Sequence, residues 1–197
     1  MIHLEGVLAG AQEVNDFCSA RNWHFCFIGG IAVQRWGEPR LTQDVDLTLV
    51  TGFGQEESFI KTFLEAFPGR ITDAHEFALQ RRVLLARTRA GIPIDAALGA
   101  LPFEERSIQR ATAWKWSESK AIKTCSAEDL VIHKCFAGRD RDWSDVESVL
   151  TRQRGKVDLP LIRKELPPLL EIKGTLPMLQ KFEEILTSIE ARFERAP

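Results

Sequence analysis

The segment from residue 28 to residue 50 constrains the fold more than any other part of the chain. Its second half, residues 44–50, reads Asp-Val-Asp-Leu-Thr-Leu-Val, an alternation of polar and apolar residues that begins with Asp44 and Asp46. Alternation of this kind predicts a β-strand with one face in the core, because successive side chains of a strand point to opposite faces. Both carboxylates are therefore expected side by side on the polar face.

A pair of glycines, Gly29 and Gly30, precedes this strand and stands before a short helix predicted over residues 31–36. An apolar and aromatic run over residues 23–28 leads into the glycines and predicts a second buried strand. Since glycine has no Cβ, the backbone at this turn can approach a phosphate closely and offer N–H groups at the start of a helix. The sequence thus predicts an anion-binding turn close to the two carboxylates.

Two carboxylates on one strand face repel each other, so we expect a counter-charge beside them. Ligation by oxygen alone suits a hard divalent cation such as Mg²⁺, which keeps water and substrate phosphates in its shell. Asp95 is a candidate third carboxylate, because it interrupts the short apolar run 92–98 and aspartate is a poor strand former. The candidate catalytic and metal-binding residues are accordingly Asp44, Asp46 and Asp95.

These motifs resemble the signature of the nucleotidyltransferase superfamily that shares the DNA polymerase β palm. That signature is a hydrophobic residue and a glycine pair, a gap of about ten residues, Asp-hydrophobic-Asp, and a third carboxylate on a later strand. The resemblance implies transfer of a nucleoside monophosphate from a nucleoside triphosphate (NTP) to a hydroxyl acceptor. It also implies that the three aspartates hold two Mg²⁺ ions, or that Asp95 instead takes the hydroxyl proton as a general base. The residues that match are Ile28, Gly29, Gly30, Asp44, Val45, Asp46 and Leu47.

A looser resemblance extends to about residue 150. Ser126 and the acids after it predict a helix over residues 126–138, which carries Lys134 and is followed by an Arg-Asp-x-x-Asp segment at residues 141–145. A lysine and a following segment of this kind look like the AbiEii-type abortive-infection toxins, which implies a cognate antitoxin as a partner. The predicted triphosphate-binding residues, besides the two glycines, are Arg40, Thr42, Lys134, Arg139 and Arg141. For the lysine and the two later arginines, an ordinary helix-surface charge is the alternative, and for Thr42 the alternative is a cap of the turn.

The rest of the pattern predicts an α/β (α+β) fold, a mixed-sheet palm followed by a C-terminal helical region. We expect the palm over residues 1–124 and the helical region over 125–197, packing on the palm, with its last helices interrupted at Pro160, Pro167-Pro168 and Pro177. The expected palm elements are helices at 7–21 and 55–67, a β-hairpin formed by 77–89 and 92–98, and edge strands at 111–117 and 121–124.

Composition excludes a disordered chain, because 44% of the 197 residues are hydrophobic. No apolar stretch is long enough to cross a bilayer, and the N-terminal residues carry acids where a signal peptide carries basic residues, so we expect a cytoplasmic protein with no membrane partner. The four cysteines lack the paired short spacing of a zinc site and are expected to be reduced packing residues. They are Cys18, Cys26, Cys125 and Cys135.

The acceptor is open at this point. A net charge of −2 argues against a basic nucleic-acid surface over the whole chain, yet four arginines cluster on the predicted hairpin with Asp95. They could line one face for a tRNA end or other RNA, or protect an edge strand from aggregation. The classes that remain are a toxin-like enzyme acting on RNA or protein, a small-molecule nucleotidyltransferase of the antibiotic-modifying type, and a non-catalytic nucleotide-binding relative. The four arginines are Arg81, Arg82, Arg87 and Arg89.

Overall fold

The protein is described by a computed structural model of residues 3–194, which divide into two compact units. The first unit takes the residues up to Ile31 and Leu41–Cys125, and the second takes Ala32–Arg40 and the chain from Ser126 onward. Helix α2 (Gly29–Trp36) begins in the first unit and ends in the second. Residues Ala32–Arg40, which lie between the glycine pair and β2 in the sequence, therefore belong to the same unit as the C-terminal helices.

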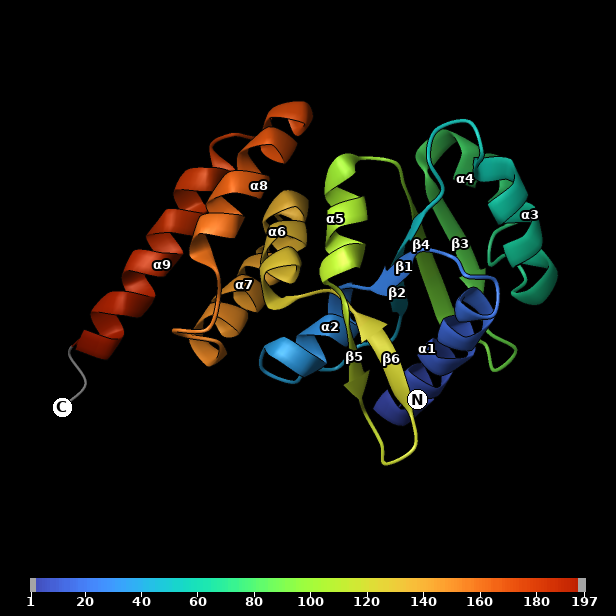
Figure 1. Cartoon of the computed structure of the whole chain (residues 1–197), viewed down its shortest axis with the longest axis horizontal. Coiled ribbons are helices and arrows are strands. Elements are labelled where there is room, and N and C mark those ends of the chain that lie inside the picture. The colour runs from blue at the N-terminus through green and yellow to red at the C-terminus, as the bar shows by residue number, and fades with distance from the viewer. Residues whose placement is uncertain (1–2, 195–197) are drawn as a thin grey trace. The chain divides into compact units, whose positions relative to one another are not determined.

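A six-stranded mixed sheet forms the centre of the first unit, in the order β3-β4-β2-β1-β6-β5 (Figure 1). Strand β2 runs parallel to β4 and antiparallel to β1, and β1 runs parallel to β6. This sheet and the helices around it confirm the predicted α/β fold class. The strands are β1 (Phe25–Phe27), β2 (Val45–Val50), β3 (Val83–Arg87), β4 (Pro93–Gly99), β5 (Thr112–Lys115) and β6 (Ala121–Thr124).

One face of the sheet is buried beneath helices α1 (Leu4–Ser19), α3 (Glu56–Ala66) and α4 (Ala74–Arg81). Side chains from these helices form one core with the apolar residues of β2 and its neighbours. Within β2, Val45, Leu47 and Leu49 are fully buried in this core, whereas Asp46 is only partly buried. The alternation in the sequence therefore predicted correctly that these three residues enter the core, although Thr48 on the opposite face is also buried.

The second unit contains helices α6 (Ala127–Ala137), α7 (Asp140–Arg152), α8 (Leu159–Lys173) and α9 (Met178–Glu194), which pack on one another. The predicted helix over residues 126–138 is confirmed, because the Ser126 hydroxyl caps α6 by accepting the Asp129 N–H at 3.1 Å. Buried residues shared among the helices make up the core of the unit. They include Ile132, Val146, Leu166, Leu170, Phe182 and Leu186.

The predicted strand over residues 77–89 is wrong in its first half, where α4 occupies Ala74–Arg81. The chain turns at Arg82, which has the left-handed φ of 55°. Its guanidinium pairs with Glu56 and donates to the carbonyl oxygens of Gly52 and Leu98. A helix can end here because these distant groups stabilise the turn.

Two further differences concern helices. The sequence contained no recognised pattern for α5 (Pro102–Arg110), which packs against β1 and β2 and whose start is fixed by Glu104 accepting the backbone N–H groups of Ala100 and Leu101. In α8, Pro167 and Pro168 lie inside the helix and do not interrupt it, since Leu166, Leu169 and Leu170 around them are buried. None of the helices in residues 3–194 has the length and apolar character needed to cross a membrane.

Candidate active site

The glycine pair lies directly against Asp46. The backbone N–H of Ile28, one residue after β1, donates to the Asp46 carbonyl oxygen at 3.0 Å. Gly29 then adopts φ of 57°, and a Cβ at this position would lie 2.6 Å from the Cβ of Asp46 and overlap its carboxylate. Only glycine fits there, because any side chain would meet both backbone strain and the carboxylate. The Gly30 N–H in turn points at Oδ2 of Asp46, at 3.4 Å.

Thr42 lies on the other side of the same turn. A Cβ on Gly30 would come 2.7 Å from the Cβ of Thr42, which is 6% exposed. The two glycines are thus closed in by Asp46 and Thr42, and this arrangement brings the predicted anion-binding turn and one of its predicted polar residues together.

Two of the three aspartates predicted from the sequence, Asp46 and Asp95, lie on one face of the sheet. Asp46 and Asp95 are direct neighbours in register on the parallel strands β2 and β4, so their side chains share a face. Burial raises the pKa of Asp95 above its usual value; the positive charge of Arg70 opposes this rise, and the negative charge of Asp44 adds to it. The carboxylate of Asp44, which precedes β2 by one residue, therefore acts electrostatically on Asp95.

Arg70 is a residue of this site that the sequence did not indicate. It lies in the loop between α3 and α4, and its backbone N–H donates to the Leu85 carbonyl oxygen of β3 at 3.1 Å. Its guanidinium forms an ion pair with Oδ1 of Asp95. The two partners are 25 residues apart in the chain and share no local motif, so no pattern in the sequence could have joined them.

The donor set of the site suits a hard cation. Asp44, Asp46 and Asp95 offer only oxygen atoms as ligands, and the Asp46 carboxylate occupies the space that a Cβ on Gly29 would take. Over residues 3–194, no three side chains of histidine, cysteine, aspartate or glutamate stand close enough together to form a metal-binding group. Asp95 is engaged with Arg70 in this arrangement, and a metal site built from all three aspartates stays a prediction.

Most of the predicted basic residues lie in the second unit, in a network of ion pairs around two buried aspartates. The Lys134 ammonium lies 3.0 Å from Asp142 Oδ1 and 2.8 Å from Asp145 Oδ2. Arg40 donates to both oxygens of Asp145 at 2.6 Å, and Arg139 pairs with Asp142 at 2.7 Å. Lys134, Asp142 and Asp145 are 6%, 1% and 3% exposed. Lys134 is therefore no solvated surface charge.

The network keeps both aspartates ionised. Burial by itself raises the pKa of Asp142, but hydrogen bonds from Arg139 and Lys134 outweigh it and leave the pKa below its usual value. The same balance holds the pKa of Asp145 low, with Arg40 and Lys134 as donors. Arg141, the remaining predicted residue, is exposed in the first turn of α7.

The arginines predicted on the hairpin do not line one strand face. Arg82 is turned inward on Glu56, as described above, and Arg81 is the last residue of α4. Arg87 alone of the four lies in β3, where it is exposed, and Arg89 follows in the exposed turn. The interpretation as alternating arginines on an edge strand is therefore wrong, because half of that predicted strand is helical.

In residues 3–194, no histidine or cysteine belongs to the set of predicted aspartates or to the ion pairs around Asp142 and Asp145. Burial lowers the pKa of His133 to about 4, so its ring is neutral at pH 7. The four cysteines are buried and form no disulfide in the part of the chain that the structure describes, and burial raises the pKa of Cys18 to about 12. They are packing residues, as expected from their spacing.

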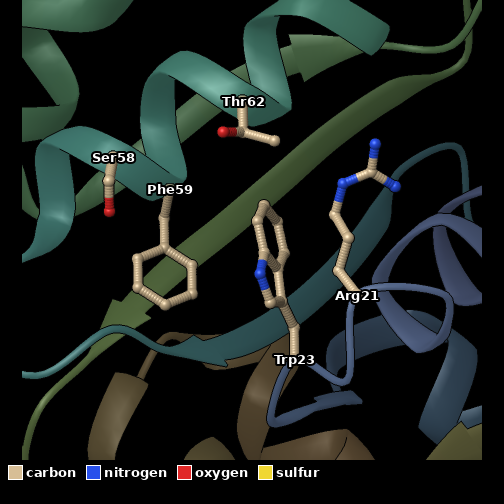
Figure 2. Close-up of a pocket in the computed structure, with 5 residues that line it drawn as sticks. All are labelled: Arg21, Trp23, Ser58, Phe59 and Thr62. Carbon is tan, nitrogen blue, oxygen red and sulfur yellow. The ribbon is translucent and has the colours of Figure 1, made fainter.

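A pocket of about 330 Å³ in the first unit lies away from the predicted site residues (Figure 2). Its walls include the rings of Trp23 and Phe59, whose centroids are 4.9 Å apart at an interplanar angle of 50°. Trp23 precedes β1, whereas the glycine pair follows β1, so the pocket and the glycines lie toward opposite ends of that strand. Its lining residues are Arg21, Trp23, Ser58, Phe59 and Thr62.

Comparison with known proteins agrees with the geometry. No curated protein matches the chain. Among solved structures, an antigenic nucleotidyltransferase-like protein from Paracoccidioides brasiliensis is 14% identical over 89% of this chain and 92% of its own, with a TM-score of 0.52. The structure of ANT(2")-Ia in complex with adenylyl-2"-tobramycin is 17% identical over 96% and 99% of the two chains, and its TM-score of 0.44 is too low to support an argument about substrate.

The likeness to the Paracoccidioides brasiliensis protein supports the fold alone. The match to a family model also assigns the chain to a family. The model of the family described as nucleotidyl transferase AbiEii toxin, type IV toxin–antitoxin system, matches residues 17–196. This match takes in both the sheet with its three aspartates and the helices with the buried ion-pair network. The chain therefore belongs to the AbiEii nucleotidyltransferase toxin family and is a nucleotidyltransferase.

Proposed function

We propose that the protein transfers a nucleoside monophosphate from an NTP to a hydroxyl group of tRNA, another RNA or a protein, in a Mg²⁺-dependent reaction of toxin type. A cognate antitoxin protein is the proposed partner. The observation that carries the proposal is the position of Asp46, which neighbours Asp95 in register on one side and abuts the Gly29 turn on the other. Carboxylates beside a turn that can approach phosphate closely are what this transfer needs.

Each predicted catalytic residue and each glycine of the pair in the first unit has a proposed role. Asp44 and Asp46 would hold Mg²⁺ with the triphosphate, and Asp95 would be a third ligand or the base that takes the acceptor proton. When bound, Mg²⁺ would neutralise the phosphates and lower the pKa of the acceptor hydroxyl. The backbone at Gly29 and Gly30 orients the triphosphate for in-line attack of the hydroxyl oxygen on the α-phosphorus, from which pyrophosphate leaves.

The triphosphate contacts of the basic and polar residues belong to the same proposal. An ammonium has three N–H groups, and two of those of Lys134 are directed at Asp142 and Asp145, so at most one remains for a phosphate oxygen. Thr42 would contribute its hydroxyl beside Gly30. The guanidinium groups proposed to contribute are those of Arg40, Arg139 and Arg141.

The experiment incubates the protein with each α-labelled NTP, Mg²⁺ and either total cellular RNA or a cell lysate. We expect label in RNA or in a protein band with the wild type and none with Asp46→Asn, which keeps the side-chain volume but loses the charge. The matched control is Glu65→Gln, the same acid-to-amide change at an exposed position of α3. Circular dichroism establishes that both variants are folded.

Two results would contradict the proposal. Label that appears only on a small molecule, such as an added aminoglycoside, would indicate an enzyme of the antibiotic-modifying type. Tight binding of NTP without transfer of label to any fraction would indicate a non-catalytic relative.

A further inference from the structure

Four residues from four segments form a row across one face of the sheet in the first unit. Asp46 of β2 is in register with Asp95 of β4, and Asp95 is in register with Leu85 of β3. The backbone N–H of Arg70 then donates to the Leu85 carbonyl oxygen, so that the loop after α3 continues the row beyond β3. The Arg70 side chain reaches back across Leu85 to Asp95.

Asp95 lies between charges of opposite sign in this row. Asp95 has Asp46 as its neighbour on one side and is subject to the negative charge of Asp44, while Arg70 is its ion-pair partner on the other side. The side chains of Arg70 and Asp95 are 30% and 33% exposed, so water screens the pair only in part. Arg70 supplies the positive charge that these carboxylates require.

A divalent cation bound by the three aspartates would need the same carboxylate. Arg70 and the cation repel each other and compete for the oxygens of Asp95, so the cation can bind fully only when the guanidinium moves away. A guanidinium released next to a metal–triphosphate complex finds phosphate oxygens, to which it can donate two parallel hydrogen bonds.

We propose that Arg70 is a substrate-binding residue that pairs with Asp95 until a divalent cation displaces it and then binds a phosphate of the NTP. This inference rests on the proposed function, because it takes Asp95 as a metal ligand. The inference predicts opposite effects of Arg70 on two affinities. Arg70 lowers the affinity for the metal alone and raises the affinity for the nucleotide. Metal and nucleotide therefore bind cooperatively.

The first measurement titrates Mn²⁺ alone into the full-length protein by isothermal titration calorimetry. Arg70→Gln should bind Mn²⁺ about three- to tenfold more tightly than the wild type, which corresponds to a partly exposed ion pair. Arg70→Lys, which keeps the charge, should stay close to the wild type. The matched control is Arg87→Gln, since Arg87 lies on the same strand face two residues from Leu85 and is exposed.

The second measurement titrates a non-hydrolysable NTP at saturating Mn²⁺. Arg70→Gln should weaken its binding about tenfold, because a charge-assisted phosphate contact is lost. Arg87→Gln should change neither affinity by more than about twofold.

Three results would overturn the inference. Mn²⁺ binding to Arg70→Gln that equals or falls below that of the wild type would mean that Arg70 does not compete for Asp95. An equal increase in Mn²⁺ affinity in Arg87→Gln would mean that removal of any positive charge near the site has this effect, and not the release of Asp95 from Arg70. Mn²⁺ binding that is the same in the wild type and in Asp46→Asn would contradict the proposed function itself, together with this inference.

Discussion

Replacement of Lys134 by alanine tests the buried ion-pair network of the second unit. Removal of one partner from a buried pair costs about 3–5 kcal/mol, because it leaves an uncompensated charge. Each aspartate keeps one arginine in this case, Arg139 for Asp142 and Arg40 for Asp145, so we expect about 3 kcal/mol, at the low end of that range. For a chain of this length this amounts to a melting temperature lower by roughly 6–12 °C.

The pH dependence of this loss identifies its cause. The pKa values of Asp142 and Asp145 lie below their usual values, so the network contributes stability at neutral pH that is lost as the pH falls through those lowered pKa values. In Lys134→Ala both pKa values rise, and the aspartates take up protons at a higher pH than in the wild type. The deficit in stability should therefore be largest near pH 7.5 and smaller near pH 3, below the ordinary aspartate pKa of 3.8.

The assay is thermal unfolding followed by circular dichroism at both pH values. The matched control is Lys164→Ala, the same change at an exposed position of α8. A melting temperature of Lys134→Ala within about 2 °C of this control at pH 7.5 would refute the reasoning, since it would mean that the ammonium stabilises nothing. A deficit of the same size at both pH values would refute the electrostatic cause.

Four further outcomes are expected. Lys134→Ala should weaken Mg²⁺–nucleotide binding about ten- to a hundredfold at a temperature where it is folded, with partial rescue by Lys134→Arg, and unchanged titration curves would exclude a triphosphate contact. Asp46→Asn should abolish transfer and slightly raise the melting temperature of the metal-free protein, because carboxylate repulsion is relieved; retained activity would place the chemistry elsewhere. Gly29→Ala should lower nucleotide affinity and stability together, by about 1–3 kcal/mol in stability from the left-handed φ alone, and a variant as stable as the wild type in a melting curve would contradict the tight fit against Asp46. The neutral, buried His133 has a pKa of about 4 against 6.5 in the unfolded chain, so stability falls by roughly 3 kcal/mol as the pH drops through this window, and His133→Gln should flatten that part of the stability–pH curve.

Local patterns were sufficient wherever one residue and its near neighbours determine the outcome. Period-two alternation predicted the strand that the structure has at Val45–Val50 and the face of Asp46, because a pleated strand leaves that signal in any sequence. The caps of α6 were likewise visible, since the Ser126 side chain accepts the N–H of a residue three positions later. The glycine pair was visible as a turn, although the contact of Gly29 with Asp46 was not.

Tertiary structure alone decided which distant groups meet. The ion pair between Arg70 and Asp95 joins residues 25 apart, and the pair between Arg40 and Asp145 joins residues 105 apart. The parallel register that sets Asp46 beside Asp95 also depends on how the sheet assembles, which neither strand encodes by itself. The end of α4 at Arg82 belongs to the same class, because its hydrogen-bond partners come from three other segments. Such contacts leave no periodic trace along the chain, and for that reason the sequence could not indicate that Arg70 is the ion-pair partner of Asp95.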